Sequence, residues 1–270
     1  MQIVKYSWKP ENGEFEPALA FSDGSRRMLL GSSISMDIGE KVCTGYSVGG
    51  KRHECPHSMR MEYGYMCNEC RMNDDFFNCM QCTGKECINT RQRDSCEQNK
   101  YFIYLAAFSK ILKVGISFDR RLQERLVEQG ADFGAKVACV TDGKEVRLIE
   151  QEMRKHLGIV DRVMSKEKHN NLFCDPNSCI ETISSAVGRL RNNGFNEHLI
   201  MPEIYDLRSY YRMESISSDP VMKEVFSGMR IDGVVEAAKG NMIIIRNGQG
   251  FYSINAHRLI GRLAKVNCIA

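Results

Sequence analysis

Eight of the twelve cysteines lie in one stretch before residue 100. Two pairs within this stretch have Cys-x-x-Cys spacing, which lets two sulfur atoms on one tight turn reach the same tetrahedral zinc ion at about 2.3 Å. The simplest assignment is two four-thiolate zinc sites, each made of one such pair and two flanking cysteines: Cys43, Cys55, Cys67 and Cys70 in the first, and Cys79, Cys82, Cys87 and Cys96 in the second.

The exact ligand set is open, because His53 and His57 flank Cys55 and either could replace a cysteine. The stretch from 41 to 98 has few large aliphatic residues, so it could hardly bury enough apolar area to fold without metal. We therefore predict that this stretch is folded by its metal ions and that its role is structural.

A disulfide framework is the alternative explanation for so many cysteines, and such frameworks are typical of short secreted domains. The chain opens on Met1 without the basic, apolar and small-residue regions of a secretory signal. It also has no apolar stretch near the ~18 residues that a membrane span requires. We expect a reducing cytoplasm, no membrane contact and buried free thiols at the remaining, scattered cysteines: Cys139, Cys174, Cys179 and Cys268.

The pattern of polar and apolar residues divides the chain into four segments. Residues 1–40 read as a β lead-in, in which Ile34, Met36 and Ile38 alternate with polar residues. The other segments are a zinc-binding module, an α+β core, and a linker followed by a small β-rich element, at 41–100, 101–195 and 196–270. Neither terminal segment looks able to fold by itself. We therefore expect the strands of the two termini to form one small β element.

The core has the element order expected of a small sheet flanked by helices. Two runs of strand-forming residues separated by a turn predict a β-hairpin, and later segments show helical spacing of apolar residues. Asp119 is expected to cap the first helix, and Ser178 with Glu181 to form the capping box of the third. The expected strands are 101–108, 111–117 and 136–140, and the expected helices 119–128, 144–157 and 178–194.

The hairpin and the helix after it resemble the GIY-YIG nuclease superfamily. Tyr104 stands where the tyrosine of the first motif would be, and Arg125, one turn after Arg121, lies on the helix that carries the family's arginine. Glu150 on the next helix matches the glutamate that binds a divalent metal. The resemblance implies that Tyr104 acts as a base or hydrogen-bond relay, that Arg125 neutralises charge on the scissile phosphate, and that Glu150 holds Mg²⁺ or Mn²⁺.

Lys113 departs from the family pattern, because it replaces the tyrosine of the second motif. A lysine could anchor a phosphate or act as a base with a lowered pKa. Ordinary structural roles compete with all of these assignments. Tyr104 could be a core aromatic with a paired hydroxyl, Arg125 could pair with Glu124 or Glu128, and Glu150 with an arginine one turn further on.

Over residues 40–160 the chain resembles a poorly characterised prokaryotic family in which zinc-binding cysteines precede such a core. The resemblance rests on the Cys-x-x-Cys pairs and on four further motifs: Cys43-Thr-Gly, Tyr104-Leu-Ala, Lys113-Val-Gly and Glu128-Gln-Gly-Ala. These motifs indicate membership and imply no particular activity.

A formal net charge of +3 gives no strong overall sign of nucleic-acid binding. Two four-thiolate zinc sites would each add a net charge of −2, so contacts to a polyanion would depend on local patches. We predict a zinc-stabilised nucleic-acid-binding protein, with RNA favoured over DNA because zinc knuckles and aromatic residues suit unpaired bases. Phosphodiester cleavage by a GIY-YIG-like endonuclease is a further activity that the resemblance implies. The alternatives are a non-catalytic adaptor that binds RNA or a protein partner, and an RNA-modifying enzyme.

Overall fold

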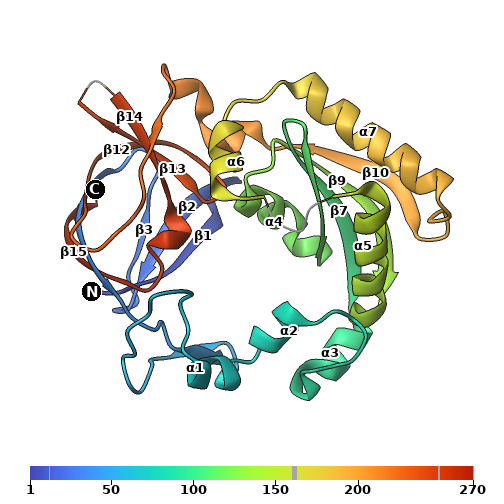
Figure 1. Ribbon diagram of the computed structural model, residues 1–270, viewed down its shortest axis with the longest axis horizontal. Helices are drawn as coiled ribbons and strands as arrows, with labels where there is room; N and C mark the ends of the chain where they lie inside the picture. The colour runs from blue at the N-terminus through green and yellow to red at the C-terminus, as the bar shows by residue number, and fades with distance from the viewer. Residues whose placement is uncertain (12, 160–162, 249, 270) are drawn as a thin grey trace. The chain divides into compact units, whose positions relative to one another are not determined.

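The computed structural model describes residues 1–11, 13–159, 163–248 and 250–269 (Figure 1). It divides the chain into two compact units, one of residues 1–77 with 210–270 and one of residues 78–209. The sequence pattern, in contrast, predicted four consecutive segments. The first four cysteines of the cysteine-rich stretch belong to the first unit, and the second four belong to the second unit.

The second unit is built on a four-stranded antiparallel sheet in the order β10-β9-β7-β8. The predicted hairpin is present as the two strands β7 and β8, with Tyr104 directly opposite Gly115. The third predicted strand is longer than expected, and β10 is a strand that the sequence pattern did not indicate. The strands are β7 (Lys100–Phe108), β8 (Ile111–Ser117), β9 (Phe133–Thr141) and β10 (Leu199–Asp206).

Helices lie on both faces of this sheet. The apolar sides of α5 (Gly143–Leu157) and α7 (Pro176–Asn192) pack with Ile103, Leu105 and Val114 into one core (Figure 1). Because side chains alternate along a strand, Tyr104 belongs to the opposite face. The short helices α4 (Leu122–Gln129) and α6 (Ser165–Asn170) complete the fold of this unit.

Two predicted helix starts were wrong. The third helix begins at Pro176 and is capped by the Asp175 carboxylate, which accepts a hydrogen bond from the Asn177 N–H at 3.1 Å. A proline in the first turn after an aspartate is a stronger start signal than the predicted Ser178–Glu181 box, which therefore lies inside the helix. Asp119 opens a 3₁₀ turn, Asp119–Arg121, and α4 follows it without a side-chain cap.

The first unit is mostly β-structure. Its six-stranded sheet has the order β11-β14-β13-β12-β4-β15, and a three-stranded sheet has the order β1-β2-β3. The predicted pairing of the two termini is confirmed, because β4 lies between β12 and β15. The strands are β1 (Ile3–Glu11), β2 (Glu14–Phe21), β3 (Arg26–Met28), β4 (Ser33–Lys41), β11 (Val221–Met222), β12 (Arg230–Lys239), β13 (Met242–Asn247), β14 (Gly250–Asn255) and β15 (Arg262–Ile269).

Trp8 ties the N-terminal strands to the C-terminal ones. Its side chain is fully buried, meets the Tyr211 ring edge-on at 5.7 Å, and donates from Nε1 to the Gly240 carbonyl at 2.7 Å. The Tyr6 hydroxyl donates to the same carbonyl at 2.6 Å. The two ends of the chain therefore share one core, which explains why neither end looks self-sufficient. In the described residues, no helix has the length and apolar character needed to cross a membrane.

Candidate functional site

The first predicted cysteine set comes together in the first unit. The sulfur atoms of its four members lie within 4.8 Å of one another, and three of the four residues are buried. The hairpin of β5 (Tyr46–Val48) and β6 (Lys51–His53) and the short helix α1 (Asn68–Asn73) hold the segment in place. Four thiols at this separation match the donor set of a closed tetrahedral zinc site. The cluster members are Cys43, Cys55, Cys67 and Cys70.

Backbone N–H groups support the sulfur atoms of this cluster. The Cys67 N–H donates to Cys43 Sγ at 3.2 Å. Burial raises the pKa of Cys43 and of Cys70, because a thiolate without a counter-ion is costly in an apolar surrounding. Burial also opposes ionisation of Cys55, but hydrogen bonds from the N–H groups of Met59 and His57 and with the Cys43 and Cys70 thiols together outweigh it and lower its pKa to about 7. A metal ion would supply the positive charge that the other thiols need to ionise.

The two histidines near this set are turned to other partners. His57 Nε2 lies 3.0 Å from a Glu69 carboxylate oxygen, and the His53 ring stacks on Tyr46 with 5.2 Å between ring centres. Among the described residues, no histidine belongs to the group of mutually close ligand atoms. The geometry therefore favours four cysteines over a mixed cysteine–histidine set.

The second predicted set surrounds one small cavity of the second unit. All four cysteines, Cys79, Cys82, Cys87 and Cys96, line a space of about 20 Å³ beside α5. That volume is close to what one water-sized particle occupies. Among the described residues, their sulfur atoms do not form a group within 4.8 Å of one another as those of the first set do. The Cys82 and Cys87 thiols donate to backbone carbonyls at 3.7 and 3.4 Å. The Asn89 amide donates to Cys79 Sγ at 3.2 Å, a contact typical of the outer shell of thiolate sites.

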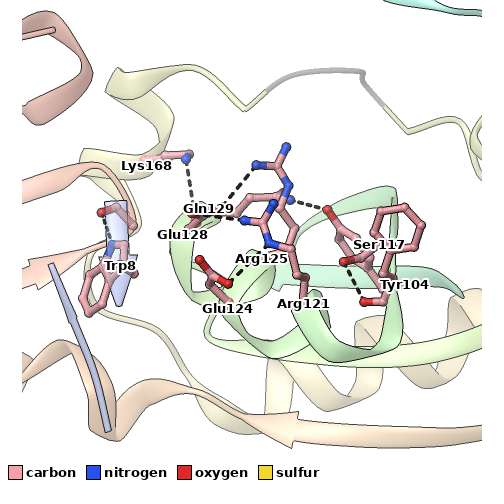
Figure 2. Close-up of polar contacts among 11 residues, drawn as sticks. Trp8, Tyr104, Ser117, Arg121, Glu124, Arg125, Glu128, Gln129 and Lys168 are labelled. Atoms are coloured by element: carbon pink, nitrogen blue, oxygen red, sulfur yellow. Dashed lines mark hydrogen bonds and ion pairs between the residues drawn. The ribbon is translucent and has the colours of Figure 1, made fainter. Parts of the chain in front are cut away.

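The Tyr104 hydroxyl is the centre of the candidate site in the core of the second unit. Its side chain is only 1% exposed, and the Gln129 amide Nε2 donates a hydrogen bond to it (Figure 2). Gln129 is held in turn by Lys168, whose ammonium donates to the Gln129 carbonyl at 2.8 Å. Tyr104 is therefore a core aromatic with a paired hydroxyl, which is the ordinary structural role predicted as the alternative to a site residue.

Two more of the predicted site residues act on the same hydroxyl. The Arg125 guanidinium hydrogen bonds to Tyr104, and the carboxylate of Glu150 is near enough for its charge to matter. Burial raises the pKa of Tyr104, Glu150 adds to that effect, and Arg125 and Gln129 oppose it. With a raised pKa the phenol stays protonated near neutral pH, which favours a hydrogen-bonding role for Tyr104 over a role as base.

Arg125 also has the ordinary partner that its helix offers. Its guanidinium lies 3.4 Å from a Glu128 carboxylate oxygen, and Arg121 pairs with Glu124 at 3.3 Å and with Glu128 at 3.6 Å. The predicted i,i+3 pairing of Arg125 with Glu128 is thus confirmed. Because the Arg125 side chain is 48% exposed, one portion of it faces the tyrosine and another faces solvent.

Gly115 and Lys113 occupy the strand that faces Tyr104. A methyl group at Gly115 would touch the Tyr104 hydroxyl and would lie only 2.5 Å from its ring carbon Cζ. The Tyr104 ring therefore occupies the space that a side chain at Gly115 would fill. Lys113 is two residues away on the same half-buried strand, opposite Ala106, so it projects from the same face as Gly115.

We expect Gly115→Ala to lower the stability of the second unit by about 1–3 kcal/mol, because a buried tyrosine cannot move aside. The matched control is Gly188→Ala in the middle of α7, where an added Cβ meets nothing within 4 Å. That change should stabilise the unit by about 0.5–1 kcal/mol. Urea unfolding followed by far-ultraviolet circular dichroism measures both. Equal midpoints for the two variants would contradict the close contact.

A known protein family matches a stretch of the chain that includes both the first cysteine set and Tyr104. The model of the family described as "Protein of unknown function (DUF2797)" matches residues 31–261. The chain belongs to the DUF2797 family. No curated protein matches it, and neither does any solved structure.

In this DUF2797 chain, the motifs that carried the prokaryotic resemblance meet at one place. Tyr104, Gly115 and Gln129 come from three of those motifs, and Gly115 and Gln129 both lie against the tyrosine hydroxyl. Gly130, which follows Gln129, ends α4 in the left-handed conformation with φ of 78°. Gln129 was not among the predicted site residues, although its motif was noted. Lys168, on a helix outside those motifs, gave no sequence signal.

Proposed function

We propose that this DUF2797 protein is a zinc-stabilised nucleic-acid-binding protein whose second unit is a GIY-YIG-like core. One observation carries the proposal: Tyr104, Arg125 and Glu150 act on one hydroxyl, and they follow one another in the order of the GIY-YIG site residues. Ordinary helix pairing accounts for Arg125 with Glu128, but it does not account for the hydrogen bond of Arg125 to Tyr104 or for the effect of the Glu150 charge on that hydroxyl.

The topology of the second unit supports the comparison with GIY-YIG proteins. β7 is flanked by its hairpin partner β8 and by β9, in a wholly antiparallel sheet. The helix after the hairpin, α4, carries the arginine, and α5, which follows β9, carries the glutamate. This is the arrangement of a small antiparallel sheet with flanking helices that the superfamily resemblance implies.

Zinc is the metal that the donor sets favour for both cysteine sets. Four thiolates in tetrahedral reach are typical of structural zinc, which is saturated by its ligands and takes no direct role in catalysis. A reducing compartment such as the cytoplasm would keep these thiols available to metal. Each unit would then carry one structural ion beside its own core.

Binding without cleavage is the form of the function that we favour. Tyr104 is buried with a raised pKa, and a lysine stands where the second tyrosine of the nuclease motif would be. A protonated phenol and a lysine are poor bases for a water molecule near the phosphate. The exposed side chains of Arg120, Arg121 and Arg125 would instead contact phosphates, and RNA is the preferred partner because zinc knuckles and aromatic residues suit unpaired bases.

The test compares Arg125→Gln with Arg246→Gln, since both arginine side chains are 48% exposed and both pair with a glutamate. Binding of single-stranded RNA, structured RNA and duplex DNA is measured by fluorescence anisotropy over a range of salt concentrations. We expect Arg125→Gln to weaken RNA binding and to reduce the salt slope by about 0.7, the value for one phosphate contact on a single strand. Arg246→Gln should leave both unchanged.

Equal effects of the two substitutions, or binding without salt dependence, would overturn the phosphate contact and favour an adaptor that binds a protein partner. Cleavage is the second candidate activity, and the effect of the Glu150 charge on the Tyr104 hydroxyl is the observation that favours it. Incubation with Mg²⁺ or Mn²⁺ tests for it, and cleavage lost in Glu150→Gln would show that the carboxylate holds the ion. Cleavage that survives in both Arg125→Gln and Glu150→Gln would show that these residues do not form the catalytic site.

A further inference from the structure

Three ligand-type side chains outside the two cysteine sets meet in the second unit. The carboxylate of Asp132 and the thiols of Cys174 and Cys179 have ligand atoms within 4.8 Å of one another. Asp132 precedes β9, Cys174 precedes α7, and Cys179 lies in the first turns of α7. No sequence pattern indicated this cluster, because the two cysteines are five residues apart and the aspartate is about forty residues earlier in the chain.

The backbone fixes this cluster before any ligand arrives. The Asp132 N–H donates to the Ala107 carbonyl at 2.8 Å, and its own carbonyl accepts from the Leu207 N–H at 3.0 Å. Ser109 is a non-glycine residue with φ of 53°. Its N–H donates to Asp132 Oδ2 at 3.3 Å, and its carbonyl accepts from Cys179 Sγ at 3.4 Å. One tight turn therefore orients both the carboxylate and a thiol.

Burial and donor type indicate what the cluster would bind. Cys179 is completely buried and Asp132 is 2% exposed, whereas Cys174 is half-buried, so the cluster is reached from the side of Cys174. Two thiolates and one carboxylate suit zinc or a similar divalent transition metal and do not suit Mg²⁺ or Ca²⁺, which prefer oxygen ligands. We propose that Asp132, Cys174 and Cys179 bind one divalent transition-metal ion of the zinc type, independently of the two four-cysteine sets.

The charge balance permits this binding in a mostly buried place. A divalent ion that displaces one proton from each thiol leaves the cluster at the same net charge of about −1. Arg208 is a nearby cation whose charge acts on both Cys174 and Asp132. Its position is fixed by Asp206, at 2.6 Å between Nη2 and Oδ2, and by the Phe133 ring, whose centre lies 4.9 Å from its guanidinium carbon.

Three protein ligands also distinguish this site from the four-thiolate sets. Zinc is four-coordinate in most protein sites, so the fourth position here is left to water or to a small exchangeable ligand. We expect this ion to exchange more readily than the ions of the four-cysteine sets, in which every position is a protein sulfur. A mild chelator should therefore remove it first.

The experiment measures zinc per chain in the full-length protein, purified with a reductant and treated with graded chelator. Cys174→Ser should lower the zinc content by one ion per chain and should abolish the fraction that a mild chelator removes. The control is Cys139→Ser, a half-buried cysteine on β9 of the same unit, which should leave the zinc content unchanged. An unchanged zinc content in Cys174→Ser would overturn the proposal.

A second variant keeps the test valid if Cys174→Ser does not fold. Asp132→Asn keeps an oxygen that can accept from the Ser109 N–H, so the local turn is preserved. Its affinity for added Co²⁺, followed by sulfur-to-cobalt charge-transfer absorption, should fall by at least about tenfold. Equal Co²⁺ affinity in Asp132→Asn, or a Cys174–Cys179 disulfide found by mass spectrometry in the reduced protein, would show that the cluster is not a metal site. Neither result affects the nucleic-acid proposal, which depends on Arg125.

Discussion

Cys70→Ser should release one zinc ion per chain and unfold the segment from Cys43 to Phe77, while the six-stranded and three-stranded sheets of the same unit stay folded. Cys70 is completely buried within the first cysteine set. The apolar cluster to which it belongs consists of three cysteines, Cys70 included, and one methionine, with a few half-buried residues beside them. Such a cluster buries too little apolar area to offset the conformational entropy of its own segment.

We therefore expect metal binding to be the main source of stability for this segment. Structural zinc contributes an apparent ~10–16 kcal/mol in zinc-finger peptides, far more than any other contact available here. The β-sheets have a separate core, in which Trp8 is fully buried and contacts Tyr211. Because Trp8 is the chain's one tryptophan, its fluorescence reports on those sheets and should not shift.

Hydrogen exchange followed by mass spectrometry, together with zinc analysis, checks this expectation. In Cys70→Ser the amides of residues 43–77 should lose protection, and in the control Cys268→Ser, which alters an exposed cysteine, they should keep it. Full protection of 43–77 in a Cys70→Ser protein would mean that the segment folds without its metal. In that case the structural role of the first set would have to be abandoned.

Local sequence patterns were sufficient where the structure is local. The Cys-x-x-Cys pairs identified a cluster because two ligands on one turn need only a few residues between them. The alternation of Ile34, Met36 and Ile38 predicted the buried face of β4 correctly, and all three are at most 3% exposed. The hairpin and α5 were likewise found from the period of their apolar residues.

The pairing of the two termini was expected, but the particular partners in arrangements that join distant segments left no such signal. β4 pairs with β12 and β15, which lie about two hundred residues later, and period-two alternation says nothing about which strand will be the neighbour. The same limit hid the cluster around Asp132. Tyr104 shows a third limit, because its sequence position fits both a core aromatic and a site residue. The structure places it in the core, hydrogen bonded to Arg125 and within reach of the Glu150 charge, and its role in a site stays a prediction.

Cys79→Ser should remove a different zinc ion and loosen a different segment of the chain, residues 78–99. These residues have few large apolar side chains, and α5 provides much of their support. Arg147 donates to the Cys79 carbonyl at 3.2 Å, and Gln151 donates to the Thr83 carbonyl at 2.6 Å. A methyl group at Gly143 would collide with Cys96 Sγ, so the fourth cysteine is packed directly against the start of α5.

Without the metal, the segment would be held by a few polar contacts, such as these two from α5, and each contributes about 0.5–1.5 kcal/mol. We therefore expect loss of one zinc ion and faster amide exchange in 78–99, with no change in 43–77 or in Trp8 fluorescence. Arg147→Ala is the matched variant, because it removes one of those contacts and leaves all four cysteines in place; it should keep its zinc. If Cys79→Ser also exposed residues 43–77, the two sets would be one cooperative metal module, and the division of the chain between them would be wrong.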